Sequence, residues 1–449
     1  MLKFPKLQDI FRKNYTLEDT FGIQEKPTKR CQTYLVRPVH DTFKHAIMST
    51  NIIVVYGESK QGKTWTIEKY CKNQLRIGCE SNMNLNALKV AMLYKLGERI
   101  LNIEHTVREQ RSKKASHHFS IIKFFRKTNI NSGFDHEKGK TYEREEVFKS
   151  VYPTININNT TQVITTISRK AKNNCFVLDN FHYLSPKVQQ DFCSLLKDFN
   201  YNNVKIIIVG VWKEASRITS LAPDLAGRCQ HIDIGSWKDE ELKRVVSMGE
   251  RALNIEISSN IIDRFVRCSV ENIGIFKDLL QRYCMNCSIY ETSKTKKYLS
   301  DEKAAESAIQ SSYQEYYQSI DDRIKNLAYP LHEKRGSRHM RQKIVCAILR
   351  IICLRELKDI VKGIKLEEIQ REVKSICSEK NELPLPESNI TQELGILHTR
   401  EENRSTKRNF IPLFYYDKPN RKLLILEPGI YMIRQYSLKG LKQITNSIY

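Results

Sequence analysis

The sequence lacks any long hydrophobic segment. Its longest apolar run, residues 344–354, contains Arg350 and is too short to cross a bilayer. The first six residues, MLKFPK, contain no apolar core of the kind found in a secretion signal. These absences predict a cytoplasmic protein that is not inserted in a membrane.

The sequence also lacks the cysteine pattern of a zinc site or of a disulfide framework. Its 12 cysteines are scattered over 449 residues, mostly within apolar runs, which is typical of small core residues in a reducing compartment. Cys284 and Cys287 form the only C-x-x-C pair, and neither a second pair nor two histidines stand at zinc spacing. A structural metal site is therefore not expected.

Acidic residues are in the minority. The chain has 51 Asp and Glu against 74 Lys and Arg, a formal net charge of +23. A charge of this size indicates an anionic partner, most simply nucleic acid, with an acidic membrane surface as the rival. The length of 449 residues exceeds that of a typical domain and predicts at least two.

A phosphate-binding loop motif organises the chain. The β-branched run at residues 52–55 predicts a buried strand, residues 57–64 read GESKQGKT, and residues 65–70 continue as a helix. This is a complete G-x-x-x-x-G-K-[ST] motif in its required context, strand before and helix after. The motif predicts that the loop binds the phosphates of ATP through Gly57, Glu58, Ser59, Lys60, Gln61, Gly62, Lys63 and Thr64. Lys63 would reach the terminal phosphates, and the Thr64 hydroxyl would bind Mg²⁺.

A second motif follows about 110 residues later. Residues 175–180 read CFVLDN, an apolar strand that ends in an acid. Asp179 is predicted to hold Mg²⁺ through water. The next position, where a hydrolytic enzyme of this type usually has Glu, is Asn180, which cannot accept a proton. The sequence therefore predicts ATP binding with slow or partner-dependent hydrolysis.

The order of these parts resembles the AAA+ and STAND branches of the P-loop ATPases, and most of all the AAA+ module of replication initiators and clamp loaders. The resemblance covers residues 50–290 and rests on the loop at 57–64, the strand ending in Asp179, a further strand at 204–210, and Gly227-Arg228-Cys229 before a last core strand. It implies a parallel α/β sheet, bound ATP and Mg²⁺, and a catalytic role for Arg228 as an arginine finger that joins subunits of a homo-oligomer. It also implies a helical lid, in which Lys277 would take the place of the second nucleotide sensor.

The predicted domains follow from this order. Residues 1–50 are an N-terminal extension packed on the nucleotide domain, residues 51–236 the nucleotide-binding core with a basic insertion at 106–140, residues 237–330 the helical lid, and residues 331–449 a winged-helix domain. Residues 106–129 contain seven Lys and Arg with three Phe interleaved, a pattern that suits a nucleic-acid strand. A solvated insertion with no partner is the alternative.

The C-terminal prediction rests on element order. Helices are predicted at residues 341–356, 365–377 and 388–398, and strands at 410–416 and 421–427, joined by the turn at 417–420. This order resembles a winged helix, whose third helix can enter the DNA major groove. Residues 331–449 contain 23 Lys and Arg and 14 Asp and Glu, so their charge is 23 − 14 = +9. Backbone contacts to DNA are predicted for Lys334, Arg335, Arg338, Arg404, Lys407 and Arg408. Contact with a protein partner is the alternative.

Together these features predict a nucleotide-controlled switch on nucleic acid, in DNA replication or transposition support or in antiviral defence. One alternative is a regulator that binds ATP without hydrolysing it and acts through protein partners. Another is a small-molecule kinase that shares the phosphate loop, which would leave the winged helix without a purpose.

Overall fold

The computed structural model describes residues 14–23, 28, 30–98, 155–211, 218, 221, 223–329, 335–402, 412–418 and 420–449. The predicted basic insertion at 106–140 lies outside them. The chain forms two compact units. Unit 1 comprises Met1–His40, Gly57–Lys69 and Ile234–Tyr449, and unit 2 comprises Asp41–Tyr56 and Tyr70–Asp233.

Unit 2 is built on a parallel sheet of five strands in the order β2-β3-β4-β1-β5. The strands are β1 (Ile52–Tyr56), β2 (Gln74–Gly78), β3 (Cys175–Asp179), β4 (Lys205–Val209) and β5 (Cys229–Asp233). β1 is buried along its whole length, whereas the edge strands β2 and β5 are partly exposed. Continuous β-branched runs are typical of strands covered on both faces, which explains why the inner strands were readable from sequence. The predicted α/β class with a P-loop parallel sheet is confirmed.

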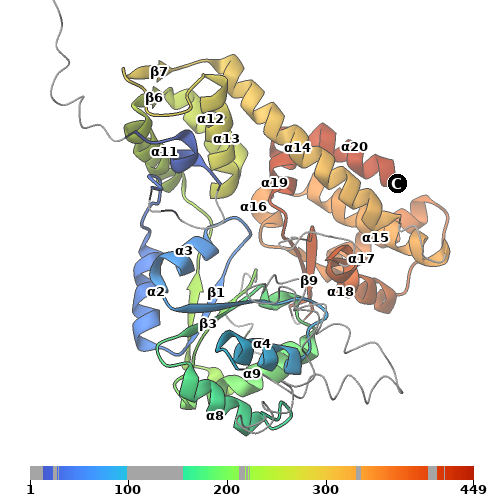
Figure 1. The fold of residues 1–449 in the computed structure, drawn as a ribbon. Coiled ribbons are helices and arrows are strands. Elements are labelled where there is room, and N and C mark those ends of the chain that lie inside the picture. Colours follow the sequence, from blue (N-terminus) through green and yellow to red (C-terminus); the bar gives the residue numbers. More distant parts are fainter. Residues whose placement is uncertain are drawn as a thin grey trace, which may run out of the picture. The chain divides into compact units, whose positions relative to one another are not determined.

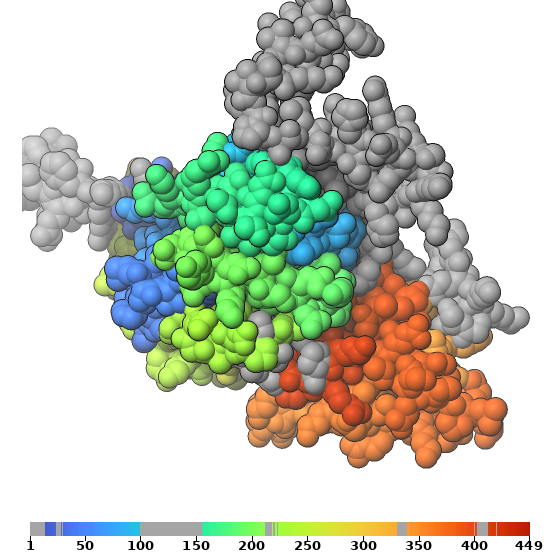
Figure 2. Space-filling view, turned by 90° about the horizontal axis from the view of Figure 1, so that it is seen from below, coloured from blue at the N-terminus to red at the C-terminus, as the bar shows by residue number. Residues whose placement is uncertain are grey.

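Three helices pack on one another against this sheet: α4 (Leu85–Lys95), α8 (Thr160–Lys170) and α9 (Pro186–Tyr201). Figure 1 shows them together below β1 and β3, and Figure 2 shows the outer surface that α8 and α9 form. Each begins at a side chain that caps its first turn, Asn84, Asn159 or Ser185. α2 (Pro38–Ser49) leads into β1, the short helix η4 (Phe181–Tyr183) follows β3, and η5 (Pro223–Leu225) precedes β5.

Unit 1 contains the segment that was predicted to be a helical lid, and we use the name lid for its residues 237–299. Its elements are α11 (Asp239–Leu253), β6 (Ile255–Ile257), α12 (Ser259–Ser269), α13 (Ile273–Asn286) and β7 (Lys297–Leu299). The short parallel pair of β6 and β7 was not predicted, because three-residue strands leave no periodic signal.

The C-terminal part of unit 1 has the predicted helices and hairpin. α15 (Arg335–Leu354), α17 (Leu366–Glu379) and α18 (Glu387–Glu402) precede the strands β9 (Phe414–Asp417) and β10 (Lys422–Ile425). A further short strand, β8 (Ile364–Lys365), completes an antiparallel sheet in the order β8-β10-β9. The structure adds α16 (Leu357–Ile360), α19 (Gly429–Tyr436) and α20 (Leu438–Ile448), which the sequence reading did not include.

One long helix joins the lid to the C-terminal part. α14 (Glu302–Ala328) has 27 residues, which corresponds to about 40 Å at 1.5 Å per residue. It packs against α13 at one end and against α15, α19 and α20 further along (Figure 1). As a result, one hydrophobic core extends from Leu17 through the lid to Ile448. The boundary predicted at residue 330, between the lid and the winged-helix domain, therefore does not separate two hydrophobic cores.

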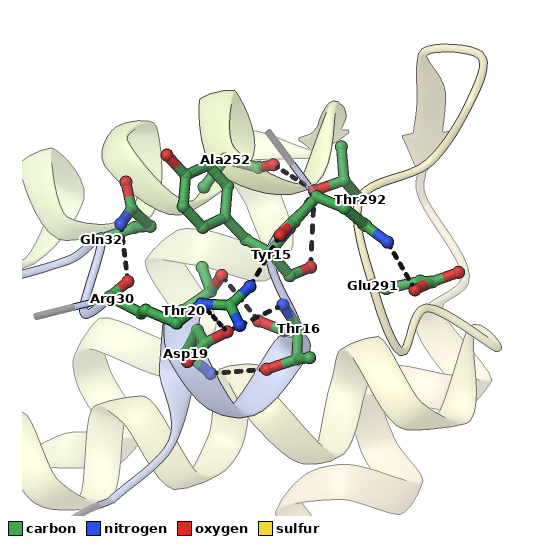
Figure 3. Close-up of polar contacts among 10 residues, drawn as sticks. Tyr15, Thr16, Asp19, Thr20, Arg30, Gln32, Ala252, Glu291 and Thr292 are labelled. Atoms are coloured by element: carbon green, nitrogen blue, oxygen red, sulfur yellow. Dashed lines mark hydrogen bonds and ion pairs between the residues drawn. The ribbon is translucent and has the colours of Figure 1, made fainter. Parts of the chain in front are cut away.

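The described part of the N-terminal segment contacts the lid. α1 (Leu17–Phe21) packs against α11 and α13. The Tyr15 N–H donates to Thr292 Oγ1 and the Thr292 N–H donates to the Tyr15 carbonyl, both at 2.9 Å (Figure 3). Gly249 of α11 lies against Phe21, because a Cβ at residue 249 would be 2.1 Å from that ring. No helix among the residues described here is both long and apolar enough to cross a membrane.

Candidate nucleotide-binding site

The predicted phosphate loop has the backbone that its glycines allow. It follows β1 directly and leads into α3 (Lys63–Tyr70). Gly57 has φ 132° and Gly62 has φ 98°, values that side-chain-bearing residues rarely adopt. The Lys63 ammonium folds over the loop and donates to the carbonyl oxygens of Gly57, at 2.7 Å, and Glu58, at 2.5 Å. The loop has the build of a phosphate-binding loop.

Lid residues hold the middle of the loop. The Asn272 amide, just before α13, donates to the Ser59 carbonyl at 3.0 Å. The Gln61 amide donates to the Glu271 carbonyl, and the Trp237 indole donates to the Gln61 carbonyl, both at 3.2 Å. Ser59, Gln61 and Asn272 are all buried. The shape of the loop is therefore fixed by the lid as well as by its own sequence.

Lys277, the predicted second sensor, lies beside the first turn of α3. Its ammonium is 5.0 Å from the centre of the Trp65 ring, and the side chain is 7% exposed. Burial lowers the pKa of Lys277, because the charged form loses its hydration. Trp65 in turn stacks on Tyr34, with ring centres 6.1 Å apart. A buried cation next to the phosphate-loop helix suits an anionic ligand, which would restore the charged form.

Asp179 ends β3 in unit 2 and has a partner that the sequence did not reveal. Arg76 of the neighbouring strand β2 donates to Asp179 Oδ2 at 2.5 Å, and both side chains are 23% exposed. Arg76 also donates to the Gln74 side chain at 3.1 Å. The parallel register pairs Gly78 with Asp179, so Arg76 stands two residues before the end of the adjacent strand. A long guanidinium can span that offset.

The predicted magnesium donors can be tested against the chemistry of the site. Within the described part of the chain, no cluster of three or more His, Cys, Asp or Glu side chains could hold a metal ion. Mg²⁺ is usually held by one or two carboxylates together with the phosphates of a substrate and water. Taken singly, the Thr64 hydroxyl and the Asp179 carboxylate are each oxygen donors of the kind that Mg²⁺ takes. The Arg76 ion pair places a competing cation on Asp179.

Asn180 adopts a left-handed backbone, with φ 57° and ψ 36°, between β3 and η4. Asn and Asp tolerate this conformation better than most residues. The backbone therefore supplies its own reason for Asn at this position, which the sequence did not show.

Arg228 lies at the other end of the sheet from the phosphate loop. It precedes β5, whose first residue, Cys229, is paired with Ile52 at the start of β1. The phosphate loop follows the opposite end of β1. The five residues of that strand span about 16 Å at 3.3 Å per residue. Arg228 is exposed and lines a polar cavity of about 230 Å³ together with Ser49, Thr50, Asn51, Asn200, Gly227, Cys229 and Gln230.

Three solved structures can be compared with this chain. A Walker-type ATPase of Pyrococcus abyssi matches over 93% of this chain and 99% of its own, with 12% identity and a TM-score of 0.48. The ORC1 protein of Aeropyrum pernix in complex with DNA matches over 97% of both chains, with 9% identity and a TM-score of 0.41. The RuvB Holliday junction branch migration motor of Thermotoga maritima matches over 88% of this chain and 92% of its own, with 9% identity and a TM-score of 0.35. No family model and no curated protein sequence matches this chain.

Proposed function

We propose that the protein is an ATP-binding AAA+-type ATPase that acts as a nucleotide-controlled switch on nucleic acid. The observation that carries the proposal is the phosphate loop itself. Two lid side chains, Asn272 and Trp237, donate hydrogen bonds to carbonyls in the middle of the loop, and the Gln61 side chain of the loop donates to the Glu271 carbonyl of the lid. A ligand that changes the conformation of the loop must therefore also change its hydrogen bonds to the lid. The Thr64 hydroxyl and the Asp179 carboxylate are the residues that would hold the Mg²⁺ that accompanies ATP, and the ion would neutralise phosphate charge.

The C-terminal part supplies the surface for nucleic acid in this proposal. We interpret α15, α17, α18 and the β8-β10-β9 sheet as a winged helix. Lys365 of β8 is in register with Lys422 of β10, and Arg421 and Lys418 are exposed at the adjoining hairpin turn. In α18, Glu393 and Glu401 are used in ion pairs with Arg341 and Arg323. Phosphate contact is therefore better supported than base readout. For the six cations predicted to touch DNA, residues 334–408, the structure describes no side chain.

Hydrolysis is proposed to be slow without a partner, since Asn180 offers no general base. The position of Arg228 at the far end of the sheet favours a role on the nucleotide of another subunit. Such a switch would serve DNA replication, transposition or antiviral defence. A regulator that binds ATP without turnover remains the second candidate, on the strength of Asn180.

The test is equilibrium binding of fluorescently labelled ATP to the full-length protein and to Lys63→Ala. Lys63→Ala should abolish binding at concentrations that saturate the wild type, because the variant loses the cation that is predicted to neutralise phosphate charge. The Lys63 ammonium donates to loop carbonyls and does not build the hydrophobic core, so the variant should fold. Lys72→Ala, an exposed lysine just past α3, is the matched control and should bind normally. Equal affinity of the wild type and Lys63→Ala would contradict the proposal.

The nucleic-acid half is tested separately, by duplex DNA binding with ATP, with ADP and without nucleotide, over a range of salt concentrations. Affinity should differ between nucleotide states and fall steeply with salt. Each phosphate contact removed, as in Lys365→Ala or Lys418→Ala, should flatten the slope of log affinity against log salt by about one. Absence of DNA binding in every nucleotide state would assign the charge to another partner.

A further inference from the structure

The phosphate loop has a third point of attachment, at Lys60. This residue has φ 60°, a left-handed conformation that is unfavourable for a residue with a long side chain. Its neighbour across the loop is Gly274 of α13, where a Cβ would lie 2.8 Å from the Lys60 Cβ. The backbone of Lys60 is thus both strained and closely packed.

The Lys60 side chain is held by two residues distant in sequence. Its ammonium donates to the Tyr316 hydroxyl of α14 at 3.1 Å and lies 4.9 Å from the centre of that ring. It is also 3.7 Å from Glu427 Oε1, in the segment before α19. Burial by itself would lower the pKa of Lys60. The nearby Glu427 carboxylate and Tyr316 hydroxyl raise the pKa by more than burial lowers it, so the net shift is upward and the ammonium stays charged.

Glu427 continues into a network within the C-terminal part. Glu427 Oε2 is 3.4 Å from Arg323 Nη1, and Arg323 Nε donates to Glu401 Oε1 at 2.7 Å. Glu401 Oε2 accepts from the Leu413 N–H at 2.8 Å, next to β9. Burial raises the pKa of Glu401. A series of ion pairs and hydrogen bonds therefore connects the phosphate loop through Arg323 of α14 to α18 and the hairpin.

Gly429 allows this arrangement. A Cβ at residue 429, the first of α19, would lie 2.3 Å from the Tyr316 ring. The Gly429 N–H also donates to Glu427 Oε1 at 3.4 Å. The close approach of α19 to α14 keeps both partners of Lys60 at the loop.

We propose that Tyr316 and Glu427 are positioning residues, which hold Lys60 and hence the phosphate loop in the conformation that binds nucleotide. The proposal rests on the proposed function, since it requires that the loop binds ATP. It assigns to the C-terminal part a direct control over nucleotide affinity. By linkage, ATP stabilises the contact between Lys60 and the C-terminal part by the same factor that the contact contributes to ATP affinity.

The first experiment measures labelled-ATP affinity of the full chain with Glu427→Gln and with Tyr316→Phe. Loss of one support for a strained residue should weaken ATP binding about five- to tenfold. Asp321→Asn is the matched control on α14, where Asp321 pairs only locally with Lys325 four residues later, and should leave affinity unchanged. Melting curves of the three variants verify that each is folded.

A second variant separates positioning from general structural damage. Lys60→Gly adopts a positive φ without support, so in its background Glu427→Gln should have no further effect on ATP affinity. If Glu427→Gln costs as much with glycine at residue 60 as with lysine, Glu427 acts by another route and the proposal is overturned. Normal ATP affinity of both single variants overturns it as well. Failure of the wild type to bind ATP would instead refute the proposed function, and with it the inference.

Discussion

Arg76 provides the sharpest test of the predicted magnesium site. Its guanidinium is 2.5 Å from Asp179 Oδ2, the carboxylate predicted to serve Mg²⁺. Arg76→Gln removes the cation and leaves a shorter, neutral amide. We expect the variant to need less Mg²⁺ for nucleotide binding, for two reasons that act in the same direction. The carboxylate loses a competitor, and the site loses a positive charge that repels Mg²⁺.

The magnitude follows from the geometry. A hydrogen bond to a charged group contributes about 1.5–3 kcal/mol when buried, and an exposed ion pair about 0–1 kcal/mol. Both side chains here are 23% exposed, which places the pair between these limits, at about 1–2 kcal/mol. The Mg²⁺ concentration for half-maximal effect should therefore fall by about five- to thirtyfold.

The assay compares ATP affinity across a Mg²⁺ titration with affinity in the presence of a chelator. The loss of the Arg76 cation would also weaken the attraction of the anionic nucleotide, with or without metal. The effect on Mg²⁺ is therefore given by the ratio of ATP affinity with Mg²⁺ to ATP affinity with the chelator. Lys170→Gln breaks a 2.6 Å ion pair with Glu98 elsewhere in unit 2 and is the control. An unchanged ratio, or a higher Mg²⁺ requirement in folded Arg76→Gln, would refute the reasoning and make Arg76 a support for Asp179.

Three further predictions concern turnover, assembly and pH. Wild-type ATP turnover should be slow, and Asn180→Asp, which suits the left-handed backbone, should raise it by up to about a hundredfold without tightening ATP binding. Fast steady-state hydrolysis by the unaided wild type would contradict this. Arg228→Ala should weaken ATP-dependent assembly, measured by light scattering, more than ATP binding by the monomer; a wild type that stays monomeric with ATP would exclude the subunit role. Burial lowers the pKa of His398 from 6.5 to about 4. As the pH falls, the unfolded chain therefore binds a proton at this residue before the folded chain does. The free energy of unfolding should then decrease by roughly 2–3 kcal/mol between pH 6.5 and pH 4. His398→Leu should remove this slope from acid unfolding curves, and an unchanged slope would assign it to other groups.

Local sequence determined the predicted nucleotide-binding core. β1, the loop and α3 were readable because a buried β-branched strand, two glycines with positive φ and a helix start each have a local physical cause. β3 ending in Asp179 and the amphipathic helices of the lid and C-terminal part were readable for the same reason. These features depend on residues within a few positions of one another.

Tertiary structure decided what surrounds the loop. Arg76 reaches Asp179 from 103 residues away, and Lys60 reaches Tyr316 across 256 residues, so no periodicity or spacing could indicate either contact. The lid and the C-terminal part share one core because α14 carries apolar residues along its whole length, and their predicted separation at residue 330 relied only on the local end of a helix pattern. The periodicity of apolar residues indicates which face of a helix or strand is buried. The element that covers this face is decided only when segments distant in sequence pack together.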